Sequence, residues 1–265
     1  MSNEYDEDFG TMLDIRGSRQ LELLRIFIET NFPERNFTLI DHGCGTGALL
    51  SVLARWYPKA CFYGVDFCDR YAAKWDAVKR QHKNIKGIFL ENFLSWGSSL
   101  PNHADIIFSN AATMYLDSKE TLKYLDLISH HTDYLVARDI DFSEAGFILN
   151  ETNAHYADIV IANCKAFFKM LEEKYGEDVG PMKQALVEQS AFKVIQYDLD
   201  REVYVKDPDS GVDMETLMNT EWYAVASSLP LSDDEKNKLS KAFKLYIAHE
   251  SVAWRNWYFQ VLSRK

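Results

Sequence analysis

The sequence has 265 residues, of which 47% are hydrophobic and 26% are charged, so it can bury a core without disulfides or a structural metal. Acidic residues number 40 against 29 basic ones, and the net charge of −11 argues against a nucleic-acid partner, because phosphate binding needs cations. No apolar run is long enough to span a bilayer, and the acidic segment 1–10 is unlike a secretory signal, so we expect a cytoplasmic protein with no membrane partner.

Helical and strand patterns alternate through the first half of the chain. Leu21, Leu24 and Ile28 fall on one face and predict a helix that ends before Pro33. An apolar strand at 37–41 runs into a glycine-rich turn. The elements that follow are helices at 49–56 and 122–129 and strands at 60–66, 85–90, 105–109 and 134–139. This alternation predicts a mainly parallel sheet, which binds ligands at the carboxyl ends of its strands.

The second half has a different pattern. Helical spacing from Tyr156 to Leu171 is followed by a break at Gly180–Pro181 and by an alternating strand at 192–204. Ser232 and Glu235 have the spacing of a capping box, which predicts a helix starting there. A final strand is predicted at 257–262. The four cysteines show neither a CxxC pair nor zinc-like spacing, so we expect reduced thiols and no metal site.

The glycine-rich turn predicts a nucleoside-binding loop. Gly43, Gly45 and Gly47 supply three positions that tolerate positive φ and let a ligand approach bare backbone. Asp66 ends the next strand, 21 residues after Gly45, where a carboxylate can accept hydrogen bonds from ribose hydroxyls. Nicotinamide dinucleotides and S-adenosylmethionine both contain this ribose, so the loop alone leaves both open.

Asp41, two residues before the first glycine, favours S-adenosylmethionine. A carboxylate there attracts a cationic cofactor end and repels a pyrophosphate. The strand is also preceded by a helical segment of about 35 residues, whereas dinucleotide domains often begin with the strand itself. No acid/base pair typical of hydride transfer is evident. An NAD-dependent oxidoreductase and a non-catalytic nucleoside-binding protein remain the alternatives.

Three segments resemble class I S-adenosylmethionine-dependent methyltransferases: 39–47 (LIDHGCGTG) is similar to their motif I, 64–66 (GVD) to the end of their second strand, and 105–112 (DIIFSNAA) to their fourth-strand motif. The pattern from Asn110 to Leu116 and the late helix resemble the trans-aconitate methyltransferase-like branch, which acts on small molecules. The resemblance implies an α/β Rossmann-like fold, with a seven-stranded, mainly parallel sheet and an antiparallel last strand. We expect a single domain, 1–265, made of an N-terminal helical segment (1–35), a cofactor-binding core (36–142), a helical insert or lid (143–190) and C-terminal strands with a helix (191–265).

The resemblance also implies roles for particular residues. Those expected to hold the methionine part of the cofactor are Asp41, Gly43, Cys44, Gly45, Gly47 and Asn110. Asp66 would bind the ribose, Phe67 would stack on adenine, and Asn92 with Phe93 would meet the adenine edge. At the Asn92 position the family usually has Asp, but an amide can also accept from the adenine amino group. Candidate acceptor-binding residues are Tyr115, His155 and Trp222.

Methyl transfer is an in-line displacement in which positioning supplies much of the acceleration. A general base is needed only when the nucleophile arrives protonated. Many small-molecule relatives have a histidine after the fourth-strand motif, where this chain has Met114 and Tyr115. We therefore assign no catalytic residue, and expect O- or N-methylation of a small carboxylate or amine. His42, inside the glycine motif, is expected to pack and not to catalyse.

Overall fold

A computed structural model describes residues 21–92, 94–148, 181–205, 230–248 and 252–265, together with some residues between 158 and 173. Contacts divide the chain into two compact units. One unit, which we call the sheet unit, consists of Arg16–Ile140, Gly180–Leu199 and Tyr258–Lys265. The other unit consists of Met1–Ile15, Asp141–Val179 and Asp200–Trp257. The boundaries fall inside three continuous strands, β5 (Thr132–Ile148), β6 (Phe192–Val205) and β7 (Val252–Arg264).

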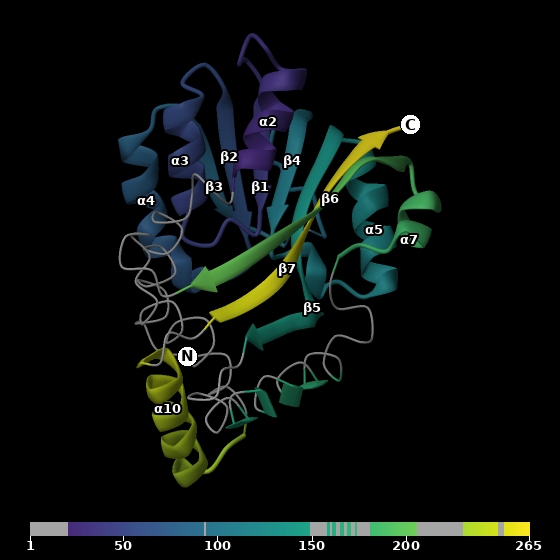
Figure 1. The fold of residues 1–265 in the computed structure, drawn as a ribbon. Coiled ribbons are helices and arrows are strands. Elements are labelled where there is room, and N and C mark those ends of the chain that lie inside the picture. The colour runs from purple at the N-terminus through teal and green to yellow at the C-terminus, as the bar shows by residue number, and fades with distance from the viewer. Residues whose placement is uncertain are drawn as a thin grey trace. The chain divides into compact units, whose positions relative to one another are not determined.

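Seven strands form one sheet in the order β3-β2-β1-β4-β5-β7-β6 (Figure 1). The first four are β1 (Thr38–His42), β2 (Cys61–Asp66), β3 (Ile85–Leu90) and β4 (Ala104–Asn110). Each neighbouring pair from β3 to β5 is parallel. The carboxyl ends of these strands therefore share one edge, which carries the glycine-rich turn.

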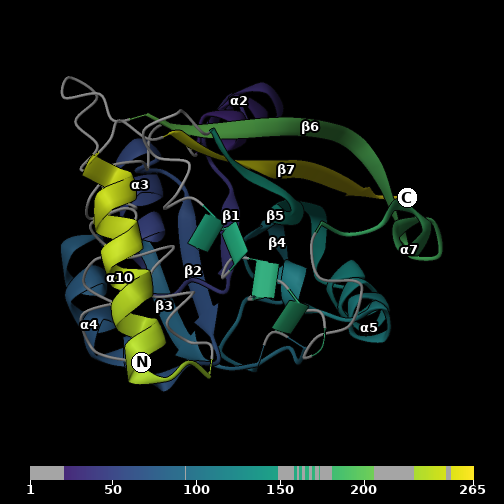
Figure 2. The same ribbon diagram turned by 60° about the horizontal axis from the view of Figure 1, so that its bottom comes forward.

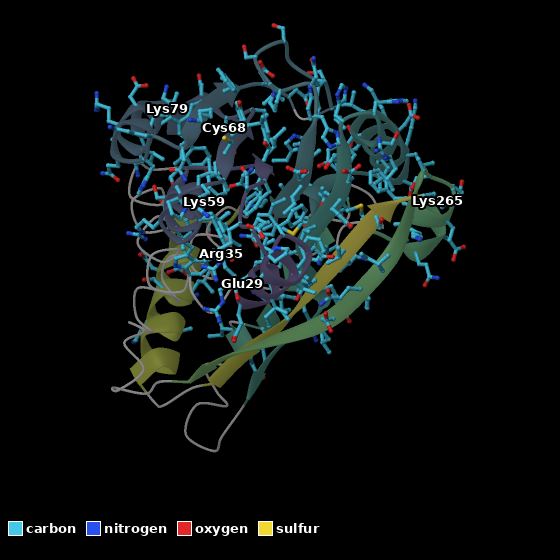
Figure 3. All side chains as sticks on the ribbon, turned by 90° about the horizontal axis from the view of Figure 1, so that it is seen from above. Glu29, Arg35, Lys59, Cys68, Lys79 and Lys265 are labelled. Carbon is cyan, nitrogen blue, oxygen red and sulfur yellow. The ribbon has the colours of Figure 1, made fainter. Side chains whose placement is uncertain are left out.

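Strand β7 runs antiparallel to its neighbours. Its last residues lie beside the starts of β5 and β6: Arg264 Nη2 donates to Asp133 Oδ1 at 2.7 Å, and the backbone N–H of Lys265 donates to the carbonyl of Ala191 at 2.8 Å. The arrowheads of β6 and β7 accordingly point in opposite directions (Figures 1 and 2). Lys265, labelled in Figure 3, also anchors this end through Nζ, which donates to the carbonyls of Glu188 and Ser190. The fold predicted from the sequence is confirmed, including its antiparallel last strand.

Alternating side chains send apolar groups to both faces of the sheet, as strand geometry requires. Leu39 and Phe108 point to one face, where they pack with α2 (Glu22–Asn31), α3 (Ala48–Trp56) and Trp75 of α4 (Ala72–Gln81). Ile40 and Ile107 point to the other, against α5 (Ser118–Ser129) and Val187 of α7 (Gln184–Glu188). The central strands of the sheet are thus covered by helices on both faces.

Several elements differ from the predicted ones. Helix α4 was not predicted, because Trp75 is its one buried residue and it has no apolar stripe. Helix α5 starts at Ser118, since Asp117 and Glu120 form a capping box before the apolar residues begin. Strand β5 continues through Ile148, into the segment expected to be helical. The box at Ser232 and Glu235 is confirmed and opens α10 (Asp233–Ala248).

The described residues between 158 and 173 are helical, as predicted for that segment. Each helix in the described ranges is too short or too polar to cross a bilayer.

Candidate functional site

The glycine-rich turn connects β1 to α3 and has the backbone that the sequence predicted. Gly43, Gly45 and Gly47 have φ values of +82°, +52° and +81°, which residues with a side chain rarely adopt. The N–H groups of Gly43 and Cys44 both donate to the carbonyl of Val65, at 2.8 and 3.1 Å, and so tie the turn to the end of β2. The turn is therefore fixed by its own sequence and by the neighbouring strand.

Both backbone polar groups of Gly45, its N–H and its carbonyl, are hydrogen-bonded to side chains. Its N–H donates to Asp66 Oδ2 at 2.8 Å, and its carbonyl accepts from Trp75 Nε1 at 2.8 Å. The second oxygen of Asp66 accepts from the N–H of Cys68 at 2.9 Å; Cys68 is labelled in Figure 3. A Cβ built on Gly45 would meet no atom of the described residues within 4 Å. The loop thus presents rigid, bare backbone to open space, which suits close approach by a ligand.

Asp41 is a buried acid at this edge. Its side chain is 2% exposed, and within the described part of the chain no group hydrogen-bonds to its carboxyl. It pairs with Gly64 across β1 and β2, so Asp41 and Asp66 point to the same face of the sheet. Burial, and secondarily the Asp66 carboxylate, raises the pKa of Asp41 from 3.8 to about 8. A buried acid without a partner indicates a site for a cationic ligand.

The ends of β2 and β3 carry the residues expected to meet adenosine. Phe67 follows Asp66 and is 70% exposed, so its ring is accessible to a ligand. The N–H of Glu91 donates to the Asp66 carbonyl and brings the end of β3 beside it. Asn92 Oδ1 accepts from the N–H of Leu94 at 2.9 Å, so this side chain shapes the turn. A cofactor role for Phe67 and Asn92 stays a prediction.

The end of β4 is held against β5. Asn110 pairs with Arg138, which is 1% exposed and places Nη1 3.5 Å from Asn110 Oδ1. Ala111 follows with φ +56°, and its N–H donates to the Arg138 carbonyl at 2.8 Å. By strand alternation Asn110 shares a face with Asp41 and Asp66. The structure therefore brings these three predicted residues to one edge and one face.

Asp139 is a buried acid on the opposite face of β5. Its carboxylate accepts from Thr113 Oγ1 at 2.6 Å and from the N–H of Met114 at 3.2 Å. Burial raises its pKa to about 7, although these two hydrogen bonds and the Arg138 charge act in the other direction. Asp139 thereby fixes the short helix Thr113–Tyr115, in which Tyr115 keeps about a third of its surface exposed.

Sequence reasoning missed Arg138 and Asp139 as part of this edge. The available signal was a pair of charged residues ending an apolar predicted strand at 134–139. His42 packs as expected: its Nδ1 lies 2.9 Å from the Tyr124 hydroxyl, and burial lowers its pKa to about 3. The Cys44 thiol points inward, because a Cβ on Gly64 would lie 2.9 Å from its sulfur, so only the backbone of Cys44 can face a ligand. Phe93, His155 and Trp222 lie outside the described residues.

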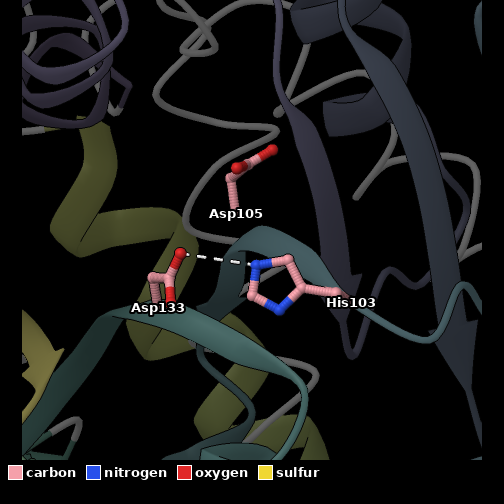
Figure 4. A group of neighbouring side chains, drawn as sticks. All are labelled: His103, Asp105 and Asp133. Atoms are coloured by element: carbon pink, nitrogen blue, oxygen red, sulfur yellow. Dashed lines mark ion pairs between the residues drawn. The ribbon is translucent and has the colours of Figure 1, made fainter.

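One cluster has the spacing of metal ligands, in that single ligand atoms of His103, Asp105 and Asp133 lie within 4.8 Å of one another (Figure 4). Its acids already have partners. Asp133 pairs with His103 at 3.4 Å and with Arg264, while Asp105 Oδ2 accepts from the N–H of Thr38 at 2.7 Å. The cluster lies at the amino ends of β4 and β5, away from the glycine turn. We assign it to surface ion pairing.

Comparisons with known proteins agree on the architecture. No protein-family model matches the sequence, and no curated protein matches it. Among solved structures, a methyltransferase candidate from Bacillus halodurans C-125 is 13% identical with a TM-score of 0.51, over 87% of this chain and 93% of that one. Coclaurine N-methyltransferase bound to N-methylheliamine and S-adenosylhomocysteine is 12% identical with a TM-score of 0.50, over 92% of this chain and 70% of that one. At such identities the likeness shows a shared fold: this chain has the Rossmann-like fold of these methyltransferases.

Proposed function

We propose that the protein is an S-adenosylmethionine-dependent methyltransferase that acts on a small molecule. The observation that carries this proposal is Asp41, a buried carboxyl beside the bare glycine turn to which none of the described residues donates a hydrogen bond. A free protein keeps such a group at a cost in stability, which a cationic ligand would offset.

The residues present fit this cofactor. Its amino-acid end carries ammonium and sulfonium charges that Asp41 would attract, and the open backbone at Gly45 leaves room for it. Asp66 has lone pairs left for ribose hydroxyls after its two backbone hydrogen bonds, and the exposed ring of Phe67 offers a surface for adenine. A dinucleotide would instead bring a pyrophosphate, which has no cationic group for Asp41 to attract, and this disfavours the NAD alternative.

When bound, the cofactor would supply a methyl group already activated for displacement by its positive sulfur. The task of the protein is then to orient the acceptor and to exclude water. Tyr115 lies in the short helix that Asp139 holds, and it is the described residue we propose on the acceptor side, whereas Asn110 at the end of β4 would lie beside the methionine part of the cofactor. Met114, which stands where many relatives have a histidine, is buried and offers no base. An acceptor that arrives unprotonated therefore suits this edge best.

Two acceptor classes meet that condition: carboxylates, as in the trans-aconitate-like branch that the sequence resembles, and amines with a low pKa. Coclaurine N-methyltransferase, bound to an N-methylated amine, has the same fold. We propose that acceptor binding also uses His155 and Trp222. Incubating the protein with the cofactor and panels of small carboxylates and amines, followed by mass spectrometry for a gain of CH₂, would separate the two classes.

Titration calorimetry tests the cofactor assignment. We expect S-adenosylhomocysteine to bind at micromolar concentrations and NAD not to bind. Asp41→Asn should weaken S-adenosylhomocysteine about tenfold or more, since it removes the charge that faces the ammonium group. Asp105→Asn is the matched control, because it makes the same chemical change at the opposite edge of the sheet. Binding of NAD in preference to S-adenosylhomocysteine would refute the proposal.

A further inference from the structure

We propose that Asp41 is protonated in the free protein and releases its proton when the amino-acid end of the cofactor binds, so that cofactor binding is coupled to proton release. This inference rests on the proposed function. It concerns one O–H bond, that of the Asp41 carboxyl, whose proton passes to the buffer as the ammonium group of the ligand arrives.

The geometry sets Asp41 apart from Asp66. Both side chains point to the same face of the sheet from neighbouring strands, and both are almost fully buried. The side chain of Asp66 accepts hydrogen bonds from two backbone N–H groups, those of Gly45 and Cys68. Asp41 has no such donor within the described residues. When two acids share a buried site and one has all the donors, the other keeps its proton.

Burial and the charge of Asp66 are the two causes that raise the pKa of Asp41. On β2 the charged neighbour is Asp66, and Cys44 in the turn and Tyr124 on α5 are buried groups whose pKa values are raised, in part by Asp41 itself. His42 is kept neutral by burial, on the other face of β1.

On the β4 side, Phe108 lies opposite Asp41, and Asn110 on the same face is uncharged. The buried cation of this edge is Arg138 on β5, whose charge acts on Asp139.

The pKa of Asp41, raised to about 8, means that the neutral carboxyl predominates in the free protein at neutral pH. A cationic ligand end favours the carboxylate, so binding must expel the proton. Affinity should therefore fall as the pH falls below about 8, approaching tenfold per pH unit.

The experiment is calorimetric titration with S-adenosylhomocysteine at about pH 7 in two buffers of different ionisation enthalpy, repeated from about pH 6 to about pH 8. The change in observed heat between buffers counts the protons released, and we expect close to one. 5′-Methylthioadenosine, which has the adenosine and the thioether but no amino acid, should bind with no buffer dependence. Asp41→Asn should remove both the proton release and the pH dependence, whereas Asp105→Asn should keep them.

The outcomes separate this inference from the proposed function. If S-adenosylhomocysteine binds with the same heat in both buffers, proton coupling is wrong and the methyltransferase assignment stands. If proton release persists in Asp41→Asn, or appears equally with 5′-methylthioadenosine, another group is responsible and the inference also fails. If S-adenosylhomocysteine does not bind the native protein at all, both proposals fall together. The comparison of the two ligands on the native protein does not depend on the variant folding.

Discussion

Gly43 and Ala112 touch so closely that a Cβ built on Gly43 would lie 2.4 Å from the Cβ of Ala112. This contact joins the glycine turn after β1 to the turn after β4. Ala111, the preceding residue, is held at φ +56°, a conformation that costs a residue with a side chain about 1 kcal/mol or more. The two turns that we propose meet the cofactor are thus packed against each other, and strain is concentrated where they meet.

Gly43→Ala should lower the free energy of unfolding by about 3 kcal/mol or more, because it combines a clash with a positive φ. Gly45→Ala is the matched control: its φ is also positive, but its new methyl group would meet open space, so we expect a loss of about 1 kcal/mol. Urea unfolding measures both. Gly45→Ala should nevertheless bind S-adenosylhomocysteine more weakly, because its methyl group occupies the space left for the ligand. Equal destabilisation by the two variants would contradict the importance of the Ala112 contact.

The glycine turn and its acids could be predicted from the sequence because their signals are local. Three glycines within five residues require a tight turn, and Asp41 and Asp66 end short apolar strands whose order along the chain fixes their common edge. The antiparallel last strand, by contrast, was expected from the family resemblance alone. The contacts of this strand are long-range: Arg264 pairs with Asp133, 131 residues earlier.

The hydrogen bonds of Asp139 and Trp75 show why the other residues of this edge could not be predicted from the sequence. The partner of Asp139, Thr113, lies 26 residues away, and the partner of Trp75, Gly45, lies 30 residues away. Neither pairing leaves a periodic signal in the sequence. A lone tryptophan in a charged segment gives no apolar stripe, so neither the helix that carries Trp75 nor its hydrogen bond to the turn could be read from spacing.

Trp75→Phe should loosen the glycine turn while keeping an aromatic ring in the core. The variant loses the hydrogen bond from Nε1 and leaves the Gly45 carbonyl without that donor, which should cost about 1 to 3 kcal/mol of stability. Because the lost partner is in the turn itself, S-adenosylhomocysteine affinity should also fall severalfold. Trp96→Phe is a suitable control, since Trp96 Nε1 donates to the Pro101 carbonyl, outside the turn. An unchanged affinity in Trp75→Phe would show that the turn does not need this brace.

Asp139→Ala should destabilise the protein by about 2 to 4 kcal/mol, because the hydroxyl of Thr113 and the N–H of Met114 both lose a buried acceptor. Asp139→Asn keeps one carbonyl oxygen and should cost about half as much. Asp133→Asn is the control at an exposed ion pair, for which we expect less than about 1 kcal/mol. Thermal or urea unfolding gives the order of the three variants. If Asp139→Ala is no more harmful than Asp133→Asn, the buried acid does not hold the turn that carries Tyr115.

Asp41→Asn should stabilise the protein when no ligand is present. The pKa of Asp41 is raised from 3.8 to about 8 in the fold, so native stability is greatest when the carboxyl is protonated and declines as the pH rises between these values. The amide is neutral at every pH, and the advantage of the variant should grow from near zero at about pH 4 to roughly 5 to 6 kcal/mol above about pH 8, at about 1.4 kcal/mol per unit of pKa change. Urea unfolding across that range measures the difference. Saturating S-adenosylhomocysteine should reverse the order, because the ligand stabilises the native protein by mass action and binds the variant weakly. A difference that does not vary with pH would mean that Asp41 ionises as an ordinary carboxyl in the folded protein.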